Sequence, residues 1–230
     1  MKFNTNSNIY TFVYMTIVVV IVAVVLAFAN QVLKPLQDAN VQLDKQKQIL
    51  GALKVDFAGQ DPAAVYDGII AAKDTLHYGE NEVYVAHLND STIKYVLPLS
   101  GKGLWGGIGG YLALDEDKNT IYGVNFNHEG ETPGLGAKIV ESKFREQFEG
   151  KHIRNAANEV VSVAVLKSGK HAEGQEQVDA ISGATITSAG VSTMLETNLA
   201  EYAEFLNESS AVSCQQSEEE NVEQNQEEEE

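Results

Sequence analysis

Four hydroxyl side chains lie close together within residues 179–188, directly before the last helical pattern of the chain. They are Ser182, Thr185, Thr187 and Ser188. Gly183 permits a sharp backbone turn, and the free N–H groups at the start of the helix expected from Ala189 favour a bound phosphate. The segment is therefore suited to place a hydroxyl group beside an anion. The alternative is that Thr187 or Ser188 only caps the N-terminus of that helix.

A glycine-rich stretch, residues 101–106, reads Gly-Lys-Gly-Leu-Trp-Gly and has the spacing G-x-G-x-x-G. A dinucleotide-binding site needs a helix directly after such glycines, whereas further glycines and a short strand pattern follow here. The stretch is therefore predicted to be a bend between strands. Trp105, the only tryptophan, is either a core anchor or an aromatic surface for a flat ligand.

A second loop, residues 128–138, reads His-Glu-Gly-Glu-Thr-Pro-Gly-Leu-Gly-Ala-Lys. Its Thr-Pro-Gly step predicts a tight turn that leads into a helix start, where backbone N–H groups are free. Glu131 offers a hydrogen-bond acceptor and Thr132 a donor. His128 and Glu131 have no second histidine at helical spacing, so no metal site is predicted. Ser182 lacks a G-x-S-x-G elbow, so nucleophilic catalysis is not predicted either.

These two motifs and the Gly-Leu-Trp element resemble, in their order along the chain, the FMN-binding domain family. In that family a flavin transferase joins the phosphate of FMN to the last threonine of the signal Asp-x-x-Ser-Gly-Ala-Thr. The resemblance implies that Thr185 is the acceptor of a phosphodiester bond. The remaining signal residues are Asp179, Ser182, Gly183 and Ala184. The residues implied to contact the flavin ring are Trp105, Glu131, Thr132, Gly134, Leu135 and Gly136.

Within this family the chain is most similar to the C subunits of Na+-translocating NADH:quinone reductases. The resemblance implies an electron carrier with covalent FMN, one subunit of an enzyme whose NADH oxidation and quinone reduction occur elsewhere. Its implied partners are the other subunits (A, B, D, E and F), which exchange electrons with it, and a flavin transferase during maturation. Three alternatives stay open: the G subunit of an Rnf-type ferredoxin:NAD+ complex, a membrane-tethered flavin-binding sensory module, and a scaffold domain without a cofactor.

An uncharged apolar run, residues 9–29, precedes these motifs. At ~1.5 Å per residue, about 21 helical residues cross a ~30 Å hydrocarbon core. The run predicts a retained transmembrane anchor, with a cleaved signal peptide ending at Ala27-Phe28-Ala29 as the alternative. Lysines flank both ends, so the charge pattern does not set the orientation. The resemblance implies the bacterial inner membrane, with the following domain on the periplasmic side.

The chain is acidic, with a formal charge of −17, and eight glutamates lie within residues 218–230. An acidic protein repels phosphate backbones, so nucleic-acid binding is not predicted. The last segment predicts a solvated, disordered tail, with a docking role as the alternative. Cys214 is the single cysteine, so it cannot form an internal disulfide and is predicted to be a free thiol.

Residue patterns predict an α+β fold with a mostly antiparallel sheet. Strands are expected over 82–88, 92–99, 109–115, 120–127 and 160–166, with turns at Asn89-Asp90 and 116–119. Helices are expected over 37–53, 61–73, 136–150 and 189–206. The predicted organisation is a cytoplasmic N-terminus over 1–8, an anchor over 9–29, a juxtamembrane helix and linker over 30–60, the FMN-binding domain over 61–207 and the acidic tail over 208–230.

Overall fold

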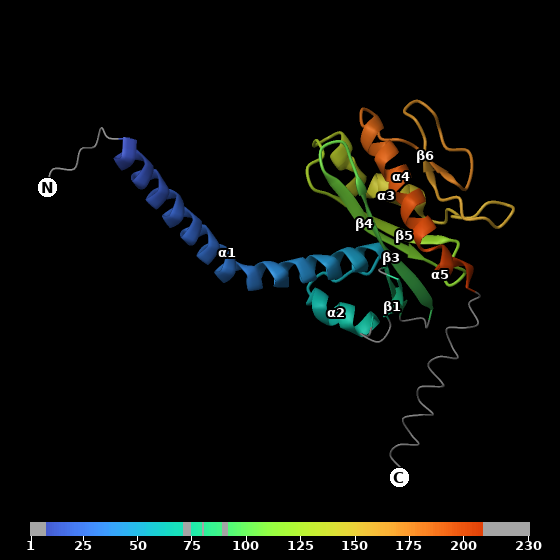
Figure 1. The fold of residues 1–230 in the computed structure, drawn as a ribbon. Helices are drawn as coiled ribbons and strands as arrows, with labels where there is room; N and C mark the ends of the chain where they lie inside the picture. The colour runs from blue at the N-terminus through green and yellow to red at the C-terminus, as the bar shows by residue number, and fades with distance from the viewer. Residues whose placement is uncertain (1–7, 71–74, 80, 89–91, 209–230) are drawn as a thin grey trace, which may run out of the picture. The chain divides into compact units, whose positions relative to one another are not determined.

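The computed structural model describes residues 8–70, 75–79, 81–88 and 92–208 (Figure 1). The chain divides into two compact units, Met1–Lys45 and Gln46–Glu230. Helix α1, Asn8–Ala52, extends from the first unit into the second, so the separate helix predicted over 37–53 is the last part of α1. A window of 18 residues in α1 has a mean hydropathy of 3.0, so the helix is long and apolar enough to cross a membrane. Cys214 and residues 209–230 of the predicted acidic tail lie outside the described residues.

The second unit is built on a five-stranded antiparallel sheet with the order β1-β2-β3-β4-β5. The strands are β1 Thr75–Tyr78, β2 Asn81–His87, β3 Ile93–Lys102, β4 Gly107–Leu114 and β5 Ile121–His128. The predicted fold class and the last four of these strands are confirmed. Strand β1 was missed because it has only four residues, too few for a clear alternation. The predicted turn at Asn89-Asp90 lies outside the described residues.

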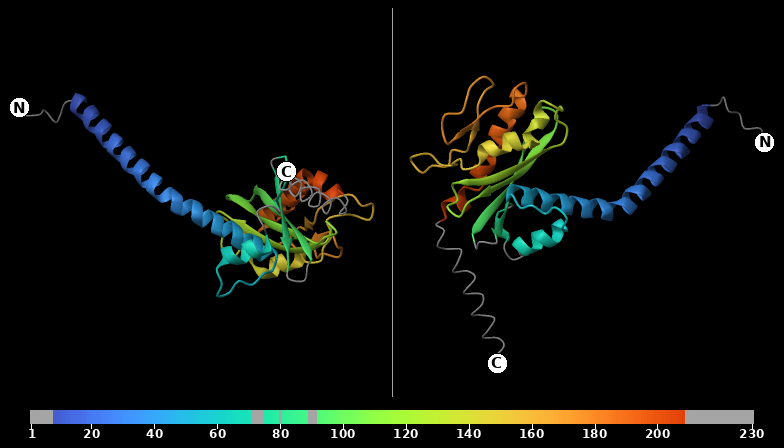
Figure 2. Two further views of the ribbon diagram at one scale, coloured as in Figure 1. Left: turned by 90° about the horizontal axis from the view of Figure 1, so that it is seen from below. Right: turned by 180° about the vertical axis from the view of Figure 1, so that it is seen from behind.

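Both faces of the sheet are covered by other elements. Successive residues of a strand point to opposite faces, so neighbouring residues of β3 belong to different core clusters. Tyr95 and Leu97 belong to a core cluster with α4, Thr185–Glu201, whereas Val96 between them packs in a second cluster with Ile49. Figures 1 and 2 show α4 on one face, and α2, Pro62–Ile69, with the end of α1 on the other.

The junction between α1 and α2 shows how local signals set the ends of helices. Lys54 has a φ of 56°, and Val55 N donates to Leu50 O at 3.0 Å, which closes the C-terminus of α1. Asp61 accepts a hydrogen bond from Ala63 N at 3.2 Å, so the predicted N-cap of α2 is confirmed. Ile49, Leu50, Ala52 and Leu53, placed by the sequence in the juxtamembrane helix, are buried in the core, while the predicted domain boundary at 61 stays a prediction.

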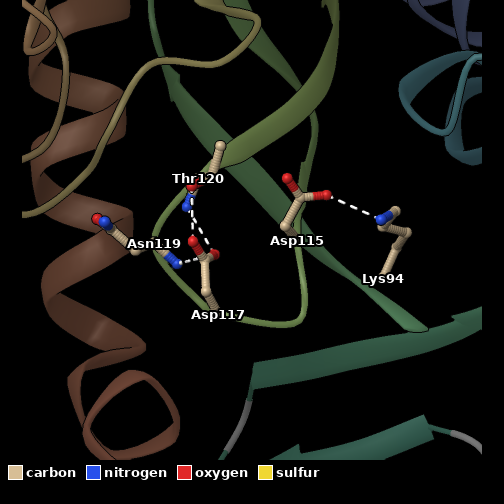
Figure 3. Close-up of polar contacts among 5 residues, drawn as sticks. All are labelled: Lys94, Asp115, Asp117, Asn119 and Thr120. Atoms are coloured by element: carbon tan, nitrogen blue, oxygen red, sulfur yellow. Dashed lines mark hydrogen bonds and ion pairs between the residues drawn. The ribbon is translucent and has the colours of Figure 1, made fainter. Parts of the chain in front are cut away.

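The turn between β4 and β5 lies where the sequence predicted it (Figure 3). The Asp117 carboxylate accepts from the backbone N–H groups of Asn119 and Thr120 at 2.9 and 2.8 Å, and from the Thr120 hydroxyl at 2.6 Å. Lys94 of β3 forms an ion pair of 2.9 Å with Asp115. These contacts hold the turn in one conformation.

The predicted helix over 136–150 is wrong. The segment forms a 3-10 helix over Gly136–Val140, α3 over Ser142–Arg145 and a second 3-10 helix over Glu146–Phe148. A regular helix turns by ~100° per residue, so it would place Ile139 and Phe148 on opposite sides. Extended backbone at Glu141 breaks the helix, and both side chains reach the core.

The predicted strand over 160–166 is also wrong in its length. Only β6, Ala164–Val165, forms, and it pairs in parallel with β7, Gln177–Val178. Ser162 has a φ of 68°, in the left-handed region that an extended strand cannot contain. The chain before β6 therefore follows an irregular path.

The side-chain amide of Asn198 joins α4 to β3. It donates to Ser100 O at 2.9 Å and accepts from Ser100 N at 2.9 Å. Strand β2 pairs with β3 only as far as Val96, so the amide takes the place of a neighbouring strand at Ser100.

We expect Asn198→Ala to lower the free energy of unfolding by about 3 kcal/mol, because both backbone groups of Ser100 lose their partner. Urea unfolding followed by circular dichroism measures this loss. The matched control is Thr197→Ala at an exposed site of the same helix, which should change stability by less than about 0.5 kcal/mol. Equal urea midpoints for the two variants would contradict the proposed role of the amide.

Candidate functional site

The glycine-rich stretch includes the tip of the hairpin between β3 and β4, as the bend interpretation predicted. Gly103 N donates to Gly106 O at 2.9 Å and closes the turn. Leu104 and Trp105 stand at this tip with 45% and 70% of their surface exposed. Trp105 is therefore not a core anchor, and its role as an aromatic surface for a flat ligand stays a prediction.

Glu131 is a charged loop residue that is almost fully buried, with 4% of its surface exposed. Its carboxylate accepts from Trp105 N at 3.0 Å and from the Thr187 hydroxyl at 2.6 Å. Burial acts to raise the pKa of Glu131, but the hydrogen bond from Thr187 acts against it. The backbone N–H groups of Trp105 and Leu104 and the nearby His128 act in the same direction, so the pKa is lowered overall.

We expect Glu131 to stabilise the fold in a pH-dependent way. Its pKa falls on folding from an ordinary value of 4.5, so its contribution is complete above about pH 4.5 and is lost as the pH falls through the folded-state pKa. Glu131→Gln should lower the urea midpoint strongly at about pH 7 and less at about pH 3. Equal losses at both pH values would show that the negative charge is not what the fold requires.

Helix α4 begins at Thr185 rather than at Ala189, with Ala184 as its N-cap and no capping side chain. Thr187 and Ser188 lie inside its first turn, so the interpretation of either as the N-cap is wrong. Gly183, with a φ of 78°, turns the chain into the helix. The first N–H groups of α4 thus have no side-chain cap, which suits the binding of an anion.

The four hydroxyl side chains of the segment differ in their access to solvent. Thr187 and Ser188 are each 1% exposed. The Thr187 hydroxyl donates to Glu131, and the Ser188 hydroxyl accepts from Ile181 N at 3.2 Å. Ser182 and Thr185 are exposed, so these two hydroxyls are the ones open to a reaction partner.

A cavity of about 210 Å³ lies between the hairpin tip, the loop after β5 and the start of α4. The predicted site residues among those that line it are Glu131, Thr132, Leu135, Gly136, Gly183, Ala184 and Thr185. The structure thus brings together the two motifs, which are about 50 residues apart in the sequence. Four predicted site residues are not among the residues that line the cavity. Three of them, Trp105, Gly134 and Ser182, are adjacent in sequence to a lining residue, whereas Asp179 is not.

Three exposed apolar side chains line this cavity. Outside α1, the large apolar side chains that the described residues expose are Leu104, Trp105, Leu135, Val140, Val161 and Ile186. Leu104, Leu135 and Ile186 line the cavity, and Trp105 is beside Leu104 at the hairpin tip. Leu104 and Ile186 were not predicted as site residues. The sequence feature that could have identified them is an apolar side chain directly beside a glycine or hydroxyl motif. An apolar rim above hydroxyl and N–H groups fits a flat ring that carries a phosphate.

Asp179 fastens the chain before α4 instead of facing the cavity. Its carboxylate accepts from Ala172 N at 2.6 Å and lies 3.3 Å from His171 Nδ1. Its own N–H donates to the Gln147 side chain at 2.9 Å. The hydrogen bond from Ala172, followed by that from His171, lowers the pKa of Asp179. Its part in a flavinylation signal stays a prediction.

A larger cavity, of about 360 Å³, lies by the β4–β5 turn, at the opposite end of β4 from the hairpin tip. Two cationic side chains that line it donate hydrogen bonds to carbonyl groups at the end of α5, Ala203–Asn207. Lys118 Nζ donates to Phe205 O at 3.1 Å, and Arg154 donates to Leu206 O at 2.5 Å. Cations at the last carbonyls stabilise a helix C-terminus, so this cavity has a structural explanation.

Comparison with known proteins gives the chain its family. Residues 103–200 match the model of the FMN-binding domain, which extends from the hairpin tip to α4 and includes every residue that lines the smaller cavity. The chain is 33% identical to the C subunit of the Na(+)-translocating NADH-quinone reductase of Haemophilus ducreyi, over 83% of this chain and 89% of that protein. The chain belongs to this family of C subunits.

Further C subunits of this reductase agree with the assignment. The protein of that name from Pseudomonas aeruginosa is 29% identical over 84% of this chain and 91% of its own length. The crystal structure of the C subunit from Parabacteroides distasonis has a TM-score of 0.70 and 39% identity, over 77% of this chain and 98% of that chain. A structure from Shewanella oneidensis, at 22% identity and a TM-score of 0.59, shares the fold. Of the two complexes that the sequence left open, the reductase is the one whose family contains this chain.

Proposed function

We propose that this chain carries FMN on Thr185 through a phosphodiester bond and acts as an electron carrier in a Na+-translocating NADH:quinone reductase. The observation that carries the proposal is the cavity between the two motifs, which has an apolar rim and is lined by Thr185 at an uncapped helix start. When bound, FMN supplies the redox chemistry, whereas the chain supplies position and electrostatics.

The residues of the cavity fall into two groups with separate tasks. At the start of α4 the Thr185 hydroxyl provides the covalent link, and backbone N–H groups stabilise the negative charge of the phosphate. Around the rim, Leu104, Leu135 and Ile186 offer apolar surface that excludes water from a ring. Trp105 extends this surface at the hairpin tip, and Thr132 and the backbone of Gly134 and Gly136 offer hydrogen-bonding groups.

The access of the hydroxyls supports Thr185 over Thr187 as the acceptor. Transfer of a phosphoryl group needs an oxygen that the transferase and its substrate can reach. The Thr187 hydroxyl is buried and committed to Glu131, whereas Thr185 is exposed and lines the cavity. Ser182 is exposed but lies before the turn at Gly183, outside the helix.

Tryptic mass spectrometry tests the attachment. The full chain is produced with and without a flavin transferase, and the peptide that contains residues 179–188 is sequenced. We expect an addition of the mass of FMN, less the water lost in forming the ester, on Thr185 and only with the transferase. An addition on Thr187 or Ser182, or none at all, would overturn the proposal.

We further propose that α1 anchors the chain in the bacterial inner membrane, with the flavin domain on the periplasmic side. There it would exchange electrons with the other subunits of the complex (A, B, D, E and F). The support is the hydropathy of α1 and the family of the chain. Cys214, the single cysteine, should react in intact cells with a maleimide that passes the outer membrane but not the inner one. If Cys214 reacts only after the inner membrane is disrupted with detergent, the opposite orientation is supported.

A further inference from the structure

We propose that Glu131 is a positioning residue, whose buried carboxylate fixes the hairpin tip that carries Leu104 and Trp105 at a set distance from the first turn of α4. The inference rests on the proposed function for its consequence, since both of these elements line the proposed flavin cavity. The contact itself is a property of the chain without the flavin.

On one side, Glu131 holds the hairpin tip through its main chain. The carboxylate accepts from Trp105 N at 3.0 Å, and the nearby N–H of Leu104 also acts to lower the pKa of Glu131. The neighbouring Glu129 carboxylate accepts from Gly107 N at 2.9 Å, but that side chain is exposed. Of these two acidic residues, Glu131 is the buried one, and it is bonded to Trp105, the neighbour of the cavity-lining Leu104.

On the other side, Glu131 holds the helix through the Thr187 hydroxyl, at 2.6 Å. The first turn of α4, which contains this threonine, also contains Thr185. The helix and the hairpin are already close, because a Cβ atom on Gly190 would lie 2.6 Å from Lys102 O. The carboxylate therefore lies between two elements in contact and is bonded to both.

Two glycines make room for the carboxylate. A Cβ atom on Gly103 would lie 2.4 Å from one Glu131 oxygen, and a Cβ atom on Gly136 would lie 2.3 Å from the other. Neither position has a positive φ, so the space, and not the backbone conformation, is what requires glycine there. Close packing against both glycines leaves the carboxylate little room to move, and a residue that positions other elements has to be fixed in this way.

An ionised carboxylate is the group that these donors require. It accepts at both oxygens and donates at neither, so it satisfies the Trp105 N–H and the Thr187 hydroxyl together. A glutamine amide has one oxygen, which can accept from Trp105 N, and its NH2 group then points to Thr187, whose hydroxyl must accept instead of donate. Both contacts lose the negative charge that strengthens them. The shape of the side chain is kept in Glu131→Gln, so the variant tests the bonds and not the packing.

The contact is tested first without flavin. Amide hydrogen exchange is measured by mass spectrometry on the full chain in detergent, made without a flavin transferase. Exchange of the Trp105 amide should be at least about threefold faster in Glu131→Gln than in the wild type, because a neutral amide oxygen accepts this hydrogen bond more weakly than a carboxylate does. The matched control, Glu129→Gln, should leave exchange of the Trp105 amide unchanged. Unchanged exchange in Glu131→Gln would overturn the proposal.

The consequence for the site is tested on the flavinylated chain, by visible circular dichroism and redox titration of the flavin. Thr187→Val keeps the charge of Glu131 but removes the bond to the helix, and Thr187→Ser restores the hydroxyl. We expect altered spectra and potential in Thr187→Val, and wild-type values in Thr187→Ser and in Thr193→Val, an exposed site of α4. Wild-type values in Thr187→Val would overturn the positioning role. An absence of flavin from the wild-type chain would overturn the proposed function instead, and the exchange experiment would still decide whether Glu131 holds the hairpin.

Discussion

The Thr185→Ala chain, produced beside a flavin transferase, is expected to carry no covalent flavin and to keep its fold. A phosphodiester needs a hydroxyl oxygen at the acceptor, and alanine has none. The threonine side chain is exposed, so its truncation should change the free energy of unfolding by no more than about 0.5 kcal/mol. In-gel flavin fluorescence and the intact mass measure the adduct, and thermal unfolding followed by circular dichroism checks the fold.

Two further variants make this result specific to one oxygen. Thr185→Ser keeps a hydroxyl at the same place and should recover flavin fluorescence. Thr187→Ala should retain the flavin, because the hydroxyl that it removes is buried and bonded to Glu131. A flavin adduct that persists in Thr185→Ala would mean that another residue is the acceptor.

The sequence predicted the sheet well because each strand carries its own signal. Strands β2 to β5 are either apolar on both faces or alternate between apolar and polar residues. The turn between β4 and β5 contains Asp117, whose carboxylate bonds to the backbone of the turn. The signal for the start of α2 is equally local, since the N-cap Asp61 and Pro62 are adjacent in the sequence. Patterns within a few residues of each other were enough for these elements.

The segment after the site loop could not be predicted in this way. Residues 136–150 have apolar residues at helical intervals, yet the chain breaks at Glu141. The break serves the packing of Phe144 and Phe148 on Phe126 of β5, with ring centroids 5.4 to 6.0 Å apart. That packing depends on the preceding strand β5, which lies outside the segment, so tertiary contacts override the local periodicity.

The site was predicted in its parts but not in its connections. Resemblance to a family identified the loop of Glu131 and the segment of Thr185, and the cavity joins them. The prediction placed Glu131 beside a ligand ring, which stays a prediction, and did not include the hydrogen bonds of its carboxylate to Trp105 N and the Thr187 hydroxyl. A hydrogen bond across 56 residues leaves no periodic pattern in a sequence, which is why this contact was missed.

The Gly136→Ala variant is expected to be destabilised more than other single changes in the loop. The added Cβ atom would lie 2.3 Å from a Glu131 oxygen and 2.6 Å from the Thr187 hydroxyl oxygen, closer than real Cβ atoms approach. Both groups are buried and bonded to each other, so neither can move without breaking that bond. Overpacking and the loss of a charged hydrogen bond together should cost about 3 kcal/mol, or roughly 6 to 12 °C in melting temperature.

The matched control for this variant is Gly130→Ala in the same loop, where a Cβ atom would meet nothing within 4 Å. Gly130 has no positive φ either, so alanine introduces no backbone strain and should leave the melting temperature unchanged. Thr187→Ala frees part of this space and removes the bond to Glu131. In the Thr187→Ala background, Gly136→Ala should therefore lower the melting temperature less than it does in the wild type. Additive losses in the double variant would show that Gly136 is required for a reason other than its approach to the Glu131–Thr187 pair.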